Sequence, residues 1–262
     1  MSHVKPKKSL GQHFLKDEEK AKQIVAMLSL PGTCNQVLEV GPGMGILTQF
    51  LFERIDFDTK VVDIDKESVH FLINRFPGKK ASIINSDFLQ LDFNEVFKGS
   101  FAIIGNFPYN ISSQILFRVL DERNRIPEVV GMFQKEVAER IAGRPGSREY
   151  GILSVFMQAW YAVEVVMQLN EDDFSPPPKV KSAVLHFMRK QNFTLPCDEA
   201  LFRRVVKTAF NQRRKTLRNA LSQLVGKELS GNLPFSDLRA EALSWEKFTE
   251  LTITIEKIIR SK

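Results

Sequence analysis

The residues most suited to chemistry follow an apolar run at residues 101–105, where Asn106, Pro108 and Tyr109 lie within four positions. This order places an amide side chain, a rigid turn and an aromatic ring at the C-terminal end of a predicted strand. An enzyme that acts on the exocyclic amine of a nucleobase needs an acceptor for that amine and a stacking surface for the base. A simpler interpretation is a strand that ends in a proline turn, with Tyr109 as core filler.

A glycine-rich loop at residues 41–45 lies between a predicted strand and a predicted helix. This order is typical of nucleotide-cofactor sites, because glycine lets the backbone approach a ligand closely. The spacing departs from the dinucleotide pattern G-x-G-x-x-G, since the third glycine comes one position early and Pro42 lacks the N–H that a pyrophosphate would use. The loop around Gly41 and Gly43 therefore favours a cofactor without a pyrophosphate, such as S-adenosylmethionine (SAM).

Two acidic residues follow the next two predicted strands. Asp63 lies 22 positions after Gly41, so its carboxylate is suited to accept from both ribose hydroxyls; a helix N-cap is the alternative role. Asp87 is suited to accept from the adenine amine with Phe88 beside the ring, although the two could equally form a polar turn. The glycine loop, both acids and Asn106 all end consecutive predicted parallel strands, and ligands of open α/β sheets bind at that edge.

The remaining segments complete an α/β domain that is followed by helices. Further strands are predicted at residues 129–133, 162–169 and 183–188, the last two as an antiparallel end pair. From about residue 198, apolar residues recur at helical spacing and no strand is predicted. We therefore predict a Rossmann-like, mostly parallel sheet domain over residues 1–191 and a small helical domain over residues 192–262.

The net charge of +6 and the pI of about 9.3 suit a polyanionic partner. The candidate phosphate-binding residues are Lys5, Lys7 and Lys8 of the N-terminal arm, Lys179 of a proline-rich loop, and Arg213, Arg214 and Lys215. A basic stripe at helical spacing is predicted at Arg203, Lys207, Arg214 and Arg218. Each segment has a simpler interpretation as an unstructured tail, a rigid connector or a solvated face.

Two loops are expected to lie over the site. Residues 9–15 hold three large apolar residues and are predicted to form an ordered loop. Residues 174–181 contain three consecutive prolines, which stiffen the chain and exclude a helix. The stiff loop could hold Phe174 against a base stacked on Tyr109, or it could be only a connector.

The two cysteines form no metal or redox motif, which favours a reducing compartment. No signal peptide is predicted, because no apolar segment follows the basic N-terminus. The most apolar stretch, residues 151–169, contains polar side chains and is predicted to be a buried helix that leads into a strand. We expect a soluble, cytoplasmic monomer that needs no metal.

Five segments resemble the KsgA type of small-subunit rRNA adenine dimethyltransferases, and the resemblance covers nearly the whole chain. They are residues 10–15, 39–43, 106–112, 176–182 and 213–217. The resemblance implies a SAM-dependent methyltransferase that methylates N6 of two adjacent adenosines near the 3′ end of the small-subunit rRNA and yields S-adenosylhomocysteine. It implies SAM contacts at the positions of His13, Leu15, Gly41, Asp63, Asp87 and Asn106. His13, Asp63 and Phe107 depart from the family's usual Asn, Glu and Leu.

On this basis the Asn106 oxygen and a backbone carbonyl near Phe107 or Pro108 are predicted to accept the hydrogens of the adenine amine. Tyr109 is predicted to stack on the flipped base with Phe174 opposite, and Phe107 to shape the pocket. Three alternatives remain open: an Erm-type methyltransferase of large-subunit rRNA, a DNA amine methyltransferase, and a ribosome-assembly factor whose methyl transfer is incidental. The leucine–glycine–glutamine start and the proline-rich loop favour the small subunit.

Overall fold

The computed structural model describes residues 4–7 and 10–261, so Lys8 of the predicted basic arm lies outside the described residues. By their contacts the residues form two compact units, Met1–Ala138 with Val163–Arg189 and Glu139–Ala162 with Lys190–Lys262. The sequence-based division into residues 1–191 and 192–262 instead kept residues 139–162 with the sheet. It stays a prediction about functional domains.

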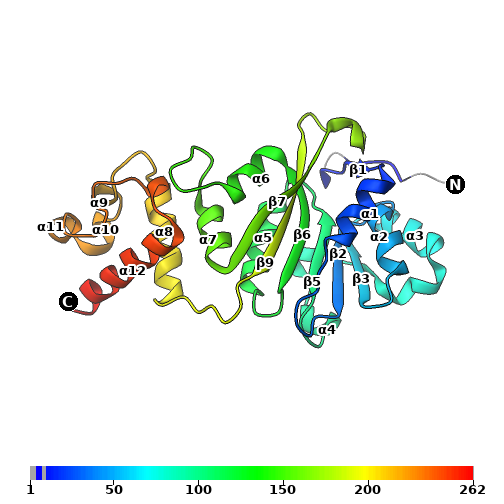
Figure 1. The fold of residues 1–262 in the computed structure, drawn as a ribbon, viewed down its shortest axis with the longest axis horizontal. Coiled ribbons are helices and arrows are strands. Elements are labelled where there is room, and N and C mark those ends of the chain that lie inside the picture. Colours follow the sequence, from blue (N-terminus) through cyan, green and yellow to red (C-terminus); the bar gives the residue numbers. More distant parts are fainter. Residues whose placement is uncertain (1–3, 8–9, 262) are drawn as a thin grey trace. The chain divides into compact units, whose positions relative to one another are not determined.

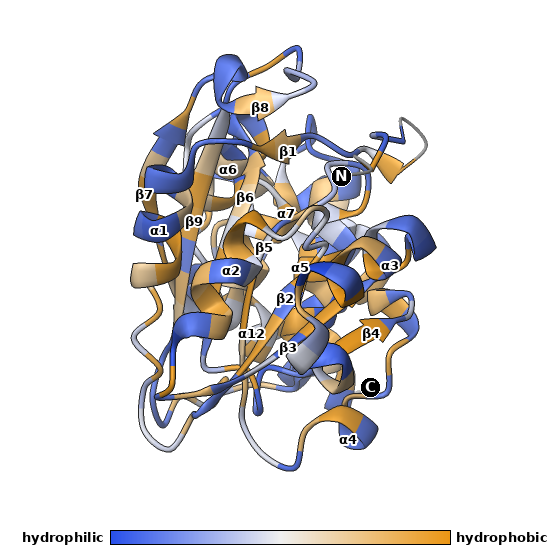
Figure 2. Cartoon of the chain, turned by 90° about the vertical axis from the view of Figure 1, so that its right-hand side faces the viewer, coloured by the Kyte–Doolittle hydropathy of each residue, from blue (hydrophilic) through white to orange (hydrophobic). Residues whose placement is uncertain are grey.

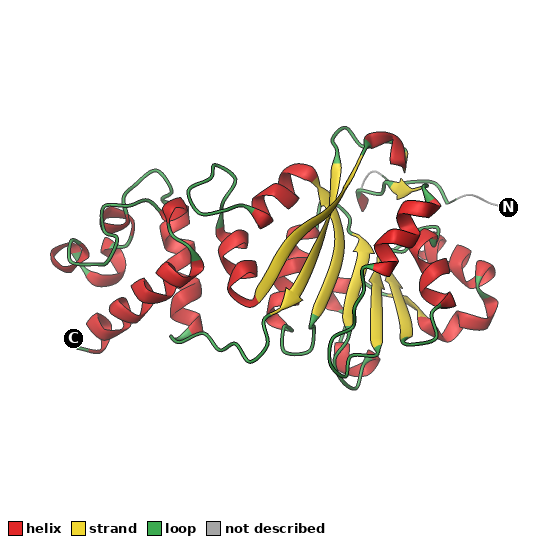
Figure 3. Ribbon diagram, in the orientation of Figure 1, coloured by secondary structure: helices red, strands yellow, loops and turns green. Residues whose placement is uncertain are grey.

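A seven-stranded sheet of described residues, in the order β4-β3-β2-β5-β6-β9-β7, organises the first unit (Figures 1 and 3). Its strands are β2 (Gln36–Val40), β3 (Asp58–Asp63), β4 (Ile83–Asn85), β5 (Ala102–Asn106), β6 (Glu128–Gln134), β7 (Tyr161–Leu169) and β9 (Ser182–Arg189). Strands β2 to β6 pair in parallel and β9 pairs antiparallel with β6. The chain runs outward from β2 through β3 to β4 and returns to β5 on the other side of β2. This arrangement confirms the predicted Rossmann-like fold and creates a switch point between β2 and β5.

Helices cover the sheet, and the hydrophobic residues of the strands form the core between them. The helices of this unit are α1 (Glu18–Ala26), α2 (Ile46–Glu53), α3 (Lys66–Arg75), α4 (Phe93–Val96) and α5 (Ser112–Asp121), with the 3-10 helices η2 (Pro77–Ser82), η3 (Phe88–Gln90) and η4 (Glu171–Asp173). Asp17 is the N-cap of α1, where its side chain accepts a hydrogen bond from the Lys20 backbone N–H at 3.0 Å. In Figure 2, α1 is mostly hydrophilic, whereas β4 is hydrophobic.

The sequence pattern predicts the third strand over residues 81–85, which is too long at its start. Residues 81 and 82 belong to η2, and β4 begins at Ile83. Pro77 at the first position of η2 fixes its φ angle and favours a turn of 3-10 helix there. The error leaves the C-terminal end of β4, which faces the site, unchanged.

A second, two-stranded sheet joins the N-terminal segment to the proline-rich loop. Strand β1 (Phe14–Leu15) pairs antiparallel with β8 (Phe174–Ser175). Of the predicted ordered loop at residues 9–15, Ser9 lies outside the described residues, and residues 10–15 are anchored by this strand. Leu15 and Phe174 are both buried in the core of the unit.

The second unit is helical. Its helices are α7 (Ile152–Trp160), α8 (Glu199–Asn211), α9 (Leu217–Ala220), α10 (Ser222–Val225), α11 (Lys227–Ser230) and α12 (Trp245–Arg260), with η5 (Ala240–Ala242) and the end of α6 (Lys135–Ala142), which begins in the first unit. The predicted continuous basic stripe is wrong, because α8 ends at Asn211. The chain then turns, with Lys215 N bonded to Gln212 O, before α9 begins at Leu217.

In the part of the chain that the structure describes, no helix has the length and hydrophobicity needed to span a membrane.

Close packing between β2 and β5 gives a first prediction. Gly105 lies in β5, and a Cβ at this position would overlap the carbonyl oxygen of Val40 and lie 3.0 Å from Phe107 Cε1. Gly105→Ala should therefore lower the free energy of unfolding by about 1–3 kcal/mol, as overpacking of a core does. Urea unfolding measures the change. Gly99→Ala is the matched control, because a Cβ there meets open space; equal unfolding midpoints for the two variants would contradict the prediction.

Candidate functional site

A cavity of about 160 Å³ opens at the C-terminal ends of β2, β3 and β5, beside the turn after β4. The sequence-predicted residues that line it are His13, Gly41, Gly43, Asp63, Asp87, Asn106, Phe107, Pro108 and Tyr109. The structure thus brings together predicted residues that are up to 96 positions apart in the sequence, because His13 and Tyr109 both line the cavity. This is the convergence that strand ends in a parallel sheet produce.

Glycine is required in the loop between β2 and α2. Gly41 and Gly43 have φ angles of +70° and +54°, a region that other residues rarely adopt. A Cβ on Gly43 would lie 2.6 Å from Phe14 Cε1, so a side chain would displace the N-terminal segment. Gly41 and Gly43 both line the cavity, so the absence of side chains lets a ligand approach their backbone closely.

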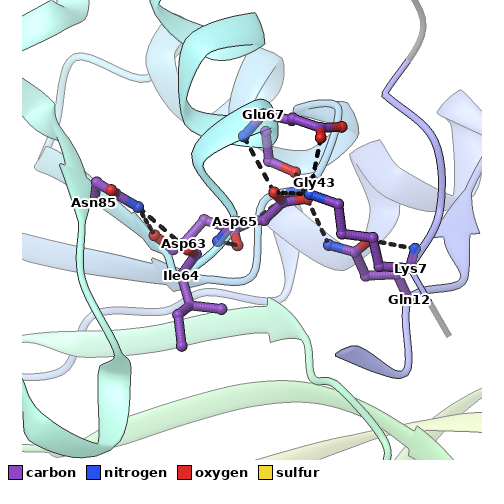
Figure 4. Close-up of polar contacts among 9 residues, drawn as sticks. Lys7, Gln12, Gly43, Asp63, Ile64, Asp65, Glu67 and Asn85 are labelled. Atoms are coloured by element: carbon purple, nitrogen blue, oxygen red, sulfur yellow. Dashed lines mark hydrogen bonds and ion pairs between the residues drawn. The ribbon is translucent and has the colours of Figure 1, made fainter. Parts of the chain in front are cut away.

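Asp63 ends β3 with its carboxylate held by two backbone N–H groups. Oδ1 accepts from Asp65 N at 2.8 Å and Oδ2 accepts from Gly43 N at 3.3 Å (Figure 4). Each oxygen keeps a lone pair for a further donor. Burial raises the pKa of the Asp63 carboxyl to about 6, against which the two backbone hydrogen bonds act.

The N-cap role that was the alternative for Asp63 belongs to Asp65 instead. Asp65 caps α3 by accepting from Glu67 N, and its carboxylate also meets Lys7 Nζ at 2.5 Å and Gln12 Nε2 at 3.3 Å (Figure 4). Lys7 lies 3.2 Å from the Glu67 carboxylate as well. The predicted phosphate-binding role of Lys7 is therefore unsupported: its ammonium ties the N-terminal segment to the start of α3.

The turn after β4 provides a polar and an apolar surface. Asp87 accepts from Leu89 N at 2.9 Å and caps η3, and its carboxylate also lines the cavity. Phe88 is buried beside it. Ile64 also lines the cavity, with 53% of its surface exposed. Sequence reasoning missed Ile64, although its position directly after Asp63 was a usable signal.

Asn106 has its amide fixed by the N-terminal segment. Its Nδ2 donates to the carbonyl oxygen of His13 at 2.6 Å. Among the described residues no hydrogen bond reaches Asn106 Oδ1, so the amide oxygen is the group left for a ligand. The following proline turn is closed by a hydrogen bond from Ile111 N to Pro108 O at 3.1 Å.

Tyr109 is half-buried at the cavity and held at two points. Its hydroxyl lies 2.6 Å from Ser182 Oγ, and its ring stacks on the His13 ring with centroids 5.4 Å apart and an interplanar angle of 25°. Burial raises the pKa of the Tyr109 hydroxyl above its ordinary value, so the phenol is neutral. Sequence reasoning gave Ser182 no role, because no local pattern links residues 73 positions apart.

Several predicted residues lie elsewhere. Leu15 and Phe174 are 3% and 1% exposed and pack together in the core, so the structure does not place Phe174 opposite Tyr109. The Phe107 ring is fully buried and packs edge-on against Phe133, in space that Gly131 leaves open. It fills the core beneath the cavity rather than narrowing its mouth.

The predicted RNA-contacting residues differ in their exposure and in the contacts that they already make. Lys179 in the first unit is exposed. In the second unit, Arg213 donates to the Arg148 carbonyl at 2.7 Å and lies 3.7 Å from Glu241, so it holds its own unit together. Arg214 and Lys215 are exposed.

A further acid, Glu39, was not assigned a role from the sequence. It is 1% exposed, accepts from Thr48 Oγ1 at 2.6 Å and lines a smaller cavity with Leu15 and Asn106. Burial, with a smaller contribution from the nearby Asp63 charge, raises the pKa of its carboxyl to about 8. Glu39 is thus protonated at neutral pH.

Comparison with known proteins covers nearly the whole chain. The sequence profile of the family described as ribosomal RNA adenine dimethylase matches residues 3–259. The ribosomal RNA small subunit methyltransferase A of Parabacteroides distasonis is 56% identical, covering 98% of this chain and 96% of that protein. The protein of the same name from Cytophaga hutchinsonii is 54% identical, covering 96% and 98%.

Two solved structures share the fold. A dimethyladenosine transferase from Plasmodium falciparum has a TM-score of 0.78 at 22% identity, covering 94% of this chain and 98% of that one. The 23S rRNA methyltransferase ErmE has a TM-score of 0.68 at 25% identity, covering 91% and 99%.

Proposed function

Because this chain belongs to the ribosomal RNA adenine dimethylase family, we propose that it transfers methyl groups from SAM to N6 of two adjacent adenosines in a hairpin loop near the 3′ end of small-subunit rRNA, two to each. As a member of that family the protein is a SAM-dependent rRNA adenine methyltransferase. The choice of small-subunit rRNA is supported by relatives of 54–56% identity that are named for that subunit. The 23S rRNA methyltransferase is 25% identical, which supports the alternative much less.

One observation carries the proposal at the level of residues. The glycine loop, two acids, an amide with a free oxygen and an aromatic ring line a single cavity. The first two features suit a nucleoside cofactor, and the last two suit a nucleobase with an exocyclic amine. A site for either ligand alone would not need both sets.

The residues that line the cavity fit SAM. Asp63 has carboxylate lone pairs for the ribose hydroxyls, Asp87 has them for the adenine amine, and Ile64 offers an apolar contact to the ring. Gly41 and Gly43 leave room for the methionine part along the backbone. When bound, SAM supplies a methyl group on a positively charged sulfur.

The protein's own contribution lies on the acceptor side. The amine of adenine is a poor nucleophile because its lone pair is delocalised into the ring. The Asn106 Oδ1 and a backbone carbonyl accept its hydrogens and favour the positive charge that develops on N6. We assign this role to the carbonyl of Phe107, because one of the two lone pairs of Pro108 O already accepts from Ile111 N. Positioning supplies most of the remaining acceleration.

Tyr109 provides the surface for the flipped adenine. His13 covers one face of its ring, which leaves the other face for the base. The ring contact and the bond to Ser182 keep Tyr109 in one orientation, so stacking costs little side-chain entropy. An amine that already carries one methyl group keeps one hydrogen, and one of the two acceptors suffices for the second transfer.

Mass analysis of RNA fragments tests the function. Immature small ribosomal subunits and protein-free large-subunit RNA are each incubated with SAM and the full-length protein. We expect two adjacent adenosines of the small-subunit RNA to gain 2 methyl groups each, about 28 Da per nucleotide, and the large-subunit RNA to stay unmodified. Methylation of the large-subunit RNA alone would favour the Erm-type alternative. A catalytically inactive variant that restored normal subunit maturation would favour the assembly role.

Charge reversal in the second unit tests RNA binding there. Arg214→Glu with Lys215→Glu should raise the Kd for small-subunit RNA about 10–100-fold and reduce the slope of log K against log salt by about 2, because two phosphate contacts are lost. Binding is measured between 50 and 300 mM potassium chloride, roughly the range over which such slopes are resolved. Lys227→Glu with Lys257→Glu makes the same charge change at two exposed positions of the same unit. If the two double variants changed the Kd and the salt slope equally, Arg214 and Lys215 would contribute to RNA binding only through the net charge of the protein.

The remaining expectations follow from the substrate. We place the protein in the cytoplasm, where ribosomal subunits are assembled, and we expect a monomer. Among the described residues no group of three or more His, Cys, Asp and Glu side chains is arranged to hold a metal ion. That methyl transfer here needs no metal stays an expectation.

A further inference from the structure

His13 joins three segments that meet at the cavity. Its backbone carbonyl accepts from Asn106 Nδ2 at 2.6 Å. Its ring Nδ1 lies 2.9 Å from the carbonyl oxygen of Pro176, in the proline-rich loop. Its ring also stacks on Tyr109. No other described residue contacts both the amide of Asn106 and the ring of Tyr109 through a hydrogen bond or a ring contact.

The chemistry of these contacts fixes their direction. A carbonyl oxygen only accepts, so Nδ1 of His13 carries the proton and donates to Pro176. Likewise, the group of Asn106 that faces the His13 carbonyl is the NH₂ donor, which leaves Oδ1 as the acceptor for a substrate. The orientation of the Asn106 amide therefore depends on where the His13 carbonyl lies.

The sequence keeps that carbonyl available. The pairing of Phe14 with Ser175 and of Leu15 with Phe174 places His13 opposite Pro176 at the next step. Proline has no backbone N–H, so position 176 offers no backbone donor that would compete with Asn106 for the His13 carbonyl. The ring of His13 bonds to Pro176 in place of a backbone group and holds the end of the strand in register.

We propose that His13 is a positioning residue for methyl transfer, whose side-chain bond to Pro176 fixes the backbone carbonyl that orients Asn106. The inference rests on the proposed function, and it assigns to the His13 side chain a role apart from the SAM contact that the resemblance implied. Because the side chain acts through Asn106, its loss should slow the chemical step more than it weakens the binding of SAM or of the RNA.

Two substitutions separate the donor from the bulk of the ring. His13→Asn keeps an N–H donor for Pro176, whereas His13→Leu keeps a similar volume without one. With immature small subunits and saturating SAM, we expect His13→Leu to lower kcat about 10–100-fold, as small misplacements of reacting groups do. His13→Asn should keep kcat within about threefold of the original protein, and the KM for SAM should change less than about threefold in both. His70→Leu is the control, since His70 is exposed on α3.

A double-mutant cycle tests whether His13 acts through Asn106. In an Asn106→Ala background, measured as single-turnover rates, His13→Leu should cause a much smaller loss than in the original protein, the remainder being the loss of its ring contact with Tyr109. Independent, multiplicative losses would overturn the inference, as would an equal loss in His13→Asn and His13→Leu, or a loss confined to the KM for SAM. Cooperative thermal unfolding of each variant shows that it is folded, and His13→Ala replaces His13→Leu if that variant is not.

The original protein, assayed in parallel, distinguishes failure of the proposed function from failure of the proposed role of His13. If it transferred no methyl group to small-subunit RNA, the proposed function would fail and this inference with it. If it transferred methyl groups normally and His13→Leu did the same, only the inference would fail.

Discussion

Asn106→Ala should lower the single-turnover rate of methyl transfer by about 10²–10³-fold, the usual effect of removing one group that stabilises charge in a transition state. The side chain offers one oxygen toward the cavity, because its NH₂ group is bound to the His13 carbonyl. Without that oxygen the adenine amine has only a backbone carbonyl to accept its hydrogens. Rates are measured with saturating SAM and immature small subunits, and SAM affinity by calorimetry.

Asn35→Ala is the matched control for this experiment. Asn35 is exposed just before β2, at the end of the sheet opposite to the cavity, so its loss should leave the rate unchanged. We expect the affinity of Asn106→Ala for SAM to fall less than about tenfold, since Asp63 and Asp87 remain. A variant that bound SAM normally and transferred methyl groups at the original rate would remove Asn106 from the mechanism.

The convergence of the site was predictable because it depends on strand order alone. In a parallel sheet, the C-terminal ends of neighbouring strands meet at one edge, so residues that end such strands come together wherever the strands lie in the sequence. Gly41, Asp63 and Asn106 end or follow β2, β3 and β5, which are adjacent in the sheet. A strand predicted with the wrong start, such as β4, still delivers Asp87 to that edge.

The contacts across the top of the cavity were not predictable in this way. Lys7 meets Asp65 across 58 positions, and Tyr109 meets Ser182 across 73. No periodicity or local motif encodes such pairs, since they depend on how loops pack after the sheet has formed. The sequence could not assign Phe174 either, because an aromatic residue beside a proline run is suited both to base stacking and to the core. Its pairing with Leu15, known only from the structure, places it in the core.

Helix ends decide between the two interpretations of Asp63 and explain the error in the basic stripe. Asp63 and Asp65 are both acids between a strand and a helix, and the one with helical residues directly after it became the N-cap. The basic stripe from Arg203 to Arg218 assumed one helix, but no glycine or proline marks the end of α8 at Asn211. Packing of α9 beside α8 then decides where the first helix stops.

Asp63→Asn should raise the Kd for SAM about 10–100-fold. The amide keeps the size of the side chain but has one acceptor oxygen, and that oxygen is needed by the Gly43 or the Asp65 backbone N–H. Loss of charge-assisted hydrogen bonds to the ribose costs about 1.5–3 kcal/mol, which gives this range. Asp58→Asn is the control, since Asp58 is exposed at the other end of β3. Equal Kd values for the two variants would show that Asp63 does not contact the cofactor.

The pH dependence of SAM binding gives an independent check on Asp63. Because burial raises the pKa of its carboxyl to about 6, the ionised acceptor disappears as pH falls through 6. The Kd for SAM should rise about tenfold between pH 7 and pH 5, and the Asn variant should lack this step. Glu39, whose pKa burial raises to about 8, stays mostly protonated across that window and so contributes little.

The contribution of Asp63 to the stability of the free protein, measured as the difference between the original protein and Asp63→Asn, should change in the opposite direction over this range. A carboxyl whose pKa is higher in the folded than in the unfolded chain binds its proton more tightly when folded, so this group's contribution to the free energy of unfolding falls as pH rises from about 4 to about 6. SAM affinity, in contrast, rises with pH because the cofactor binds the carboxylate. If ionised Asp63 instead stabilised the free protein, both quantities would rise together, and the assignment of Asp63 as a buried acceptor kept for the ribose would be wrong.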